Sequence, residues 1–161
     1  MMPTVISDVA TPALSRASES LIRAAFVGTA LFIVTASTAV FVKPVRVVAM
    51  VVAGTLFFAG IAAFFAAYFR AVARSRDVVL GVGGIYFLSG SAPRAVQVKL
   101  LGAVAVQSAV GLATASLRPY TSLAFGMLVP MFGVGITGLW GALYGRYPER
   151  PGPSASLADD D

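Results

Sequence analysis

Carboxylates and hydroxyls are the side chains in this sequence that could carry catalytic chemistry. The carboxylates are Asp8, Glu19, Asp77, Glu149 and the run 159–161, scattered without the paired spacing that acid–base catalysis or a divalent cation needs. Serine is frequent, but the chain has no His to serve as its general base and no Cys to act as a nucleophile. We therefore expect no catalytic residue, no cofactor and no metal site, and the sequence predicts a protein that is not an enzyme.

Five basic residues form the second group that could bind a ligand. They are Arg70, Arg74, Arg76, Arg94 and Lys99, and they lie around the break between two long apolar stretches. Such a cluster beside a membrane attracts anionic lipid headgroups or an acidic patch on a partner. The simpler interpretation is that these charges only set the topology of the chain, and both interpretations stay open. We expect no nucleic-acid partner, because no basic and aromatic groove accompanies the pI of about 10.1.

Gln107 is the most polar side chain inside an apolar stretch. A carboxamide in hydrocarbon must find hydrogen-bond partners, so we expect Gln107 to point inward and bond across helices, with Thr35, Ser37 or Thr38 as partners. Such a bond stabilises a membrane bundle by about 1 kcal/mol. A substrate-contacting role in a cavity is the alternative interpretation.

The elements that must position these groups are membrane spans. Only 12% of the 161 residues are charged, about half of what a soluble domain carries, and the mean hydropathy is +0.86. Four stretches without a charge, at 24–42, 47–69, 100–117 and 119–145, are each long enough as helices to cross a hydrocarbon core of about 30 Å, or nearly so. The sequence therefore predicts an all-α integral membrane protein with the lipid bilayer as its first partner.

The distribution of Lys and Arg decides between four and five spans. The apolar stretch 78–88 is too short to cross alone, and counting it as a span would divide the positive charges evenly between the two sides. With four spans and both termini in the cytoplasm, nine basic residues lie inside and three outside. We therefore predict two antiparallel hairpins that cross a membrane, with both termini cytoplasmic.

This topology divides the chain into three parts. We expect a disordered cytoplasmic tail at 1–20, a four-helix transmembrane domain at 21–147 and a second disordered cytoplasmic tail at 148–161. Within the transmembrane domain, the spans are predicted at about 24–42, 47–69, 95–117 and 121–145, and a basic interfacial connector at 70–94. Pro130 is expected to kink the last span, because it removes a backbone donor.

Small residues recur at helical spacing on three of the predicted spans. Close backbone approach along such faces is the usual way for helices to associate in lipid. The fourth-span face is consistent with packing inside the chain or with a homo-oligomer interface. The predicted helix-packing residues are Ala59, Ala63, Ala66, Gln107, Gly111, Thr137, Gly141 and Gly145.

Three segments carry a resemblance to known proteins. The segments 84–94, 113–120 and 125–133 resemble uncharacterised small four-helix integral membrane proteins of high-GC Gram-positive bacteria. The resemblance covers about residues 70–150. It implies a location in the plasma membrane, the bacterial inner membrane, and brings no activity.

Three functions remain open. The first is a structural or accessory subunit that packs beside a larger cell-envelope complex. The second is an oligomeric or holin-like pore, for which Thr35, Thr38, Gln107, Ser108, Thr114 and Thr137 supply only a thin polar stripe. The third is a passive binder or carrier of a lipid or another apolar molecule, which would use a cleft opened by the Pro130 kink. Coupled transport is disfavoured, because no Asp, Glu, Lys or Arg lies inside the apolar stretches 24–42, 47–69, 100–117 and 119–145.

Overall fold

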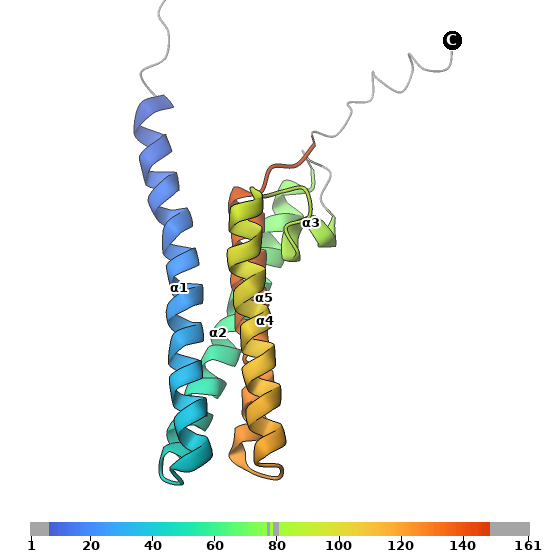
Figure 1. Ribbon diagram of the computed structural model, residues 1–161. Coiled ribbons are helices and arrows are strands. Elements are labelled where there is room, and N and C mark those ends of the chain that lie inside the picture. Colours follow the sequence, from blue (N-terminus) through green and yellow to red (C-terminus); the bar gives the residue numbers. More distant parts are fainter. Residues whose placement is uncertain (1–6, 77, 79–80, 149–161) are drawn as a thin grey trace, which may run out of the picture.

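The computed structural model describes residues 7–76, 78 and 81–148, and the elements that it shows there are all helical (Figure 1). The elements are α1 (Ser7–Phe41), α2 (Val45–Arg74), α3 (Val82–Tyr86), α4 (Arg94–Leu117), the 3-10 helix η1 (Ser122–Leu128) and α5 (Pro130–Tyr144).

Four of these segments are long and apolar enough to cross a membrane. They are Arg16–Phe41, Val45–Arg74, Arg94–Leu117 and, with η1 and α5 taken together, Ser122–Tyr144. The predicted all-α class with four membrane-length helices is confirmed, and the chain is a multi-pass membrane protein in contact with the lipid bilayer.

The four spans form two antiparallel hairpins. The tight turn from α1 to α2 and the turn from α4 to η1 lie at the same end of the bundle, and α3 lies at the other end (Figure 1). Helices α1 and α4 therefore run in the same direction, as do α2 and α5. This arrangement matches the predicted pairing of the spans.

Helix α5 is the centre of the bundle. It contacts every other helix, and its Phe132, Ile136 and Trp140 belong to the main apolar core. Glycine allows α5 to occupy this central position, because a Cβ on Gly135 would collide with the carbonyl oxygen of Gly60 in α2. The backbones of α2 and α5 thus come close enough for extensive van der Waals contact, which is the main attraction between helices in lipid.

The predicted N-terminal tail is wrong for residues 7–20, because helix α1 already begins at Ser7. Ala, Leu, Arg and Glu in this stretch are strong helix formers. An ion pair of 3.6 Å between Glu19 and Arg23, four residues apart, adds local support. Residues 1–6 and 149–161 of the two predicted tails lie outside the described residues.

The predicted kink at Pro130 is also corrected. The last span is a 3-10 helix, η1, followed by α5, and Pro130 is the first residue of α5. Proline is well suited to this position, because the amide of the first helical residue has no acceptor within the helix and the proline ring already fixes a helical φ.

Candidate functional site

The polar centre of the bundle is a hydrogen bond between α4 and α1. Gln107 is fully buried, and its Nε2 donates to Thr29 Oγ1 over 2.7 Å. The predicted inward orientation of Gln107 is therefore found, but the predicted partners Thr35, Ser37 and Thr38 are wrong. The hydroxyls of Thr35 and Thr38 donate to the carbonyls of Leu31 and Val34 in their own helix.

The other half of the Gln107 carboxamide has no hydrogen-bond partner among the described residues. Its Oε1 is buried and lies against Gly133 of α5, where an added Cβ would come within 2.7 Å of it. The Thr29 hydroxyl donates in turn to the carbonyl of Ala25 over 2.7 Å. The pair thus joins α1 to α4 beside α5 and leaves one buried acceptor unsatisfied.

The packing face of α2 is rotated from the predicted one. Ala63 is buried, but Ala59 and Ala66 are exposed, and the buried positions are Gly60, Ala67 and others on their side of the helix. The cause is the position of α5, which covers the side of α2 that contains Gly60. Ala59 and Ala66 therefore make no helix packing inside the chain.

The small residues of α4 and α5 pack within the chain. Gly111 is buried where an added Cβ would lie 2.7 Å from the carbonyl oxygen of Gly126 in η1. Thr137, Gly141 and Gly145 are all buried, and a Cβ on Gly141 would collide with the carbonyl oxygen of Ile85. This α5 face is occupied by the connector, which leaves it unavailable as a homo-oligomer interface.

The five predicted basic residues differ in their surroundings. Arg70, Arg76, Arg94 and Lys99 are exposed, whereas Arg74 turns inward to the end of α5. Arg74 Nη1 donates to the carbonyl of Ala142 over 2.6 Å and Nη2 to that of Gly145 over 3.4 Å. Arg74 is thus a cap on the C-terminal end of α5, where a cation satisfies free carbonyls and the helix dipole.

Tyr147 closes the same end of the bundle. Its ring lies 5.6 Å from the Arg74 guanidinium, and its hydroxyl lies 3.2 Å from the Gly84 carbonyl and 3.1 Å from that of Gly141. Burial raises the pKa of the Tyr147 phenol above its ordinary value. The hydroxyl therefore stays protonated at neutral pH and serves as a donor that ties the connector to α5.

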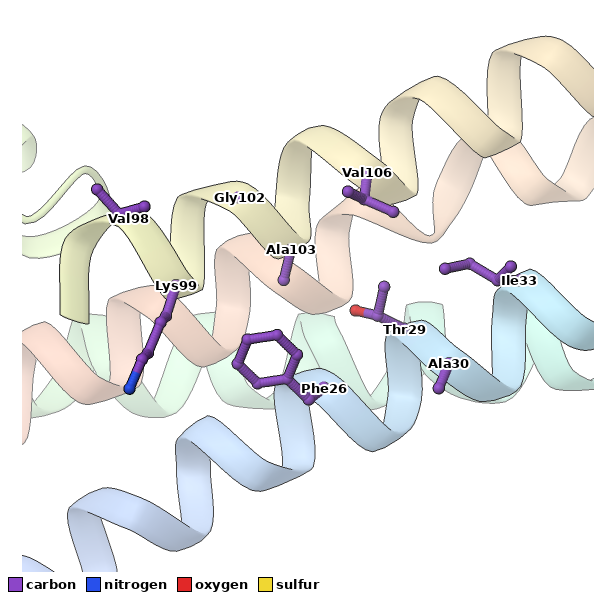
Figure 2. Close-up of a pocket in the computed structure, with 9 residues that line it drawn as sticks. All are labelled: Phe26, Thr29, Ala30, Ile33, Val98, Lys99, Gly102, Ala103 and Val106. Carbon is purple, nitrogen blue, oxygen red and sulfur yellow. The ribbon is translucent and has the colours of Figure 1, made fainter. Parts of the chain in front are cut away.

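An open apolar groove lies between α1 and α4 (Figure 2), and the α4 residues that line it belong to the half of that helix nearer its N-terminal end. We call it the α1–α4 groove, and its volume is about 370 Å³. Figure 2 shows Lys99 at one end of it, with Ile33 and Val106 at the other. Its lining residues are Phe26, Thr29, Ala30, Ile33, Val98, Lys99, Gly102, Ala103 and Val106.

This groove was not among the sequence-based predictions, and Pro130, where a cleft was predicted, does not line it. The sequence signal for the groove was the small size of Ala30 on α1 and of Gly102 and Ala103 on α4, which line it from opposite sides. A second groove of about 220 Å³ lies along the same two helices toward the hairpin turns, between Ser37 and Leu117. No charged residue lines that second groove.

The polar residues of the predicted pore stripe do not face a common passage in the described chain. Gln107, Thr114 and Thr137 are buried inside it, whereas Thr38 and Ser108 are exposed. Ser108 donates to its own helix, to the Val104 carbonyl over 2.9 Å.

Comparison with known proteins adds no family, since no family model, no curated protein and no solved structure matches the chain.

Proposed function

We propose that this chain is a non-enzymatic plasma-membrane protein that acts as a structural or accessory subunit beside a larger cell-envelope complex. The observation that carries the proposal is an exposed row of small residues on α2. Ala59, Ala62 and Ala66 follow one another at helical spacing on its surface, after α5 has taken the opposite side. A row of this kind lets a helix of another protein approach the α2 backbone closely.

The large side chains around this row support a partner helix of membrane type. Phe58 is 69% exposed and Phe65 is 52% exposed, and by helical periodicity both lie on the same side of the small residues. In lipid these aromatic rings can pack against a neighbouring helix that rests on the alanines beside them. A second copy of the chain is the competing occupant of this surface.

We also propose an orientation in which the end of the bundle that carries α3 faces the cytoplasm, with both termini on that side. Arg70, Arg76, Arg94 and Lys99 are exposed at that end. Each Lys or Arg close to an anionic membrane surface contributes about 1 kcal/mol of attraction. These residues therefore contact anionic headgroups of the inner leaflet, while Arg74 is engaged with α5.

The test is an affinity pull-down of the tagged full-length chain in a gentle detergent, followed by mass spectrometry. We expect a defined larger membrane complex that is lost when Ala62 and Ala66 are both changed to Leu. The matched control changes Ala105 and Ala109 of α4, which are exposed alanines on another helix, to Leu.

Two results would overturn the proposal. If the wild-type chain ran alone, or only as a homo-oligomer, the accessory role would be rejected, and a membrane-depolarisation assay would then test the pore hypothesis. If the two double variants lost the complex equally, the α2 surface would not be the contact.

A further inference from the structure

The walls of the α1–α4 groove suit hydrocarbon. Thr29 supplies the one hydroxyl of the lining, and that hydroxyl already accepts from Gln107 and donates to Ala25. The rest of the lining consists of apolar side chains, apart from Lys99 at one end (Figure 2). Water or a polar solute would therefore find no free partner along the groove, whereas an apolar chain needs none.

The groove is about two-thirds as long as the hydrocarbon part of one leaflet is thick. It extends from Phe26 to Ile33 on α1 and from Lys99 to Val106 on α4, which is about 10 Å of helix on each side. Half of a hydrocarbon core measures about 15 Å. The groove thus runs from the level of Lys99, near the first turns of α4, toward the middle of the membrane, as a lipid acyl chain does.

The volume of the groove is sufficient for an acyl chain. At about 370 Å³ it is more than twice that of a cavity of about 150 Å³ that holds a benzene ring.

The charge at the end of the groove selects the headgroup. Lys99 is exposed, and among the described residues no acidic side chain pairs with it. Its ammonium lies at the end of the groove away from Ile33 and Val106 (Figure 2). A lipid phosphate at this end would bind the ammonium. An anionic lipid has no cationic group of its own beside the phosphate, so its attraction to Lys99 is stronger than that of a zwitterionic lipid.

We propose that the α1–α4 groove binds one anionic phospholipid, with an acyl chain between Phe26 and Val106 and the phosphate at Lys99 Nζ. The site extends the headgroup contact proposed above, because it adds a defined groove for one acyl chain of the lipid. It does not depend on a protein partner. The second groove between α1 and α4 has no cation in its lining, so it lacks the feature that would select an anionic lipid.

The experiment measures lipid retained per chain by native mass spectrometry, after delipidated full-length protein is titrated with phosphatidylglycerol or with phosphatidylcholine. We expect one phosphatidylglycerol per wild-type chain, held about fivefold more tightly than phosphatidylcholine, which is the preference that one surface Lys supplies. Lys99→Gln should remove this preference.

A groove-filling variant tests the acyl chain itself. A Cβ on Gly102 would meet nothing within 4 Å, so Gly102→Leu fills the groove without a backbone clash, and it should abolish binding of the single lipid. Gly54→Leu on α2 is the matched control, because a Cβ there also meets nothing within 4 Å and Gly54 does not line the groove.

The outcomes separate this site from the broader headgroup contact. Loss of lipid in Lys99→Gln with full retention in Gly102→Leu would overturn the groove site and leave the headgroup contact standing. Equal binding of the two phospholipids by the wild type, or loss of lipid in Gly54→Leu as well, would also overturn it. Loss in Gly102→Leu alone, with the phosphatidylglycerol preference removed in Lys99→Gln, establishes it.

Discussion

At the scale of single residues, the hydrogen bond from Gln107 to Thr29 fixes how α1 lies against α4. Both side chains are buried, and the bond is the one side-chain to side-chain hydrogen bond that joins these two helices among the described residues. The two polar atoms of the Gln107 carboxamide differ, because Nε2 is paired with Thr29 whereas Oε1 has no partner. The unpaired Oε1 lowers the stability of the fold whether or not residue 29 accepts a hydrogen bond.

This asymmetry predicts that Thr29→Val is more destabilising than Gln107→Leu. Valine keeps the shape of threonine but leaves both polar atoms of Gln107 buried and unpaired, whereas leucine removes the carboxamide together with its unsatisfied oxygen. We expect a loss of about 1 kcal/mol for Thr29→Val and less for Gln107→Leu. Unfolding in a mild detergent, followed by circular dichroism against denaturant, measures both.

Thr38→Val is the control for this comparison, since Thr38 is exposed and its hydroxyl bonds only to its own helix. Its stability should equal that of the wild type. A larger loss in Gln107→Leu than in Thr29→Val would contradict the asymmetry and show that the carboxamide is a net stabiliser.

At the scale of elements, the crossing of α2 and α5 determines which small residues are used. Small residues cover a wide arc of α2, from Ala59 through Gly60 to Ala67, and α5 can cover only part of it. The sequence shows that arc but not which part α5 occupies, because the choice depends on where Gly60 and Gly135 meet. Ala59 and Ala66 therefore lie on the exposed part.

The close approach of the two backbones predicts a steric effect at Gly135. A Cβ there would collide with the Gly60 carbonyl, so Gly135→Ala must separate α2 from α5, with a cost of about 1–3 kcal/mol. Gly54→Ala, where the added Cβ meets nothing within 4 Å, should be neutral or slightly stabilising in the same unfolding measurement. Equal stability of the two variants would show that the helices are not in this contact.

The cap on α5 predicts a separate effect at Arg74. Arg74→Met keeps the apolar stem but removes the guanidinium from the carbonyls of Ala142 and Gly145. We expect a loss of about 1 kcal/mol, within the range for a cation at a partly buried helix C-terminus. Arg70→Met, at an exposed position near the end of α2, is the control and should leave stability unchanged. A similar loss in both would assign the effect to surface charge.

At the scale of the whole molecule, the number of spans and their pairing could be predicted from the sequence, because both depend on the lengths of uncharged stretches. The start of α1 at Ser7 could not, since Ser and Thr in that tail suggested disorder while its Ala, Leu and Glu favour helix. The groove and the Arg74 cap depend on how distant helices meet, and the small residues on each single helix do not determine that.

The orientation of the bundle gives the whole-molecule prediction. The chain has no cysteine, so single cysteines can be placed without background labelling. Cysteines at Pro44 and Pro119, both exposed at the hairpin end, should react with a membrane-impermeant maleimide in intact cells. Cysteines at Ser75 and Pro148 should react only after permeabilisation. External labelling at Ser75 or Pro148 would reverse the proposed orientation.

The central position of α5 has a consequence for how the protein is made. Spans enter the membrane in the order in which the ribosome produces them, and α5 is the last of the four. Until it arrives, the side of α2 that contains Gly60 and the Gln107 Oε1 atom have no α5 to pack against, and the two hairpins lack the helix that contacts both of them. A chain that stalls before α5 is therefore an incomplete bundle, and we expect it to be less stable and more readily degraded by a membrane protease than the full chain.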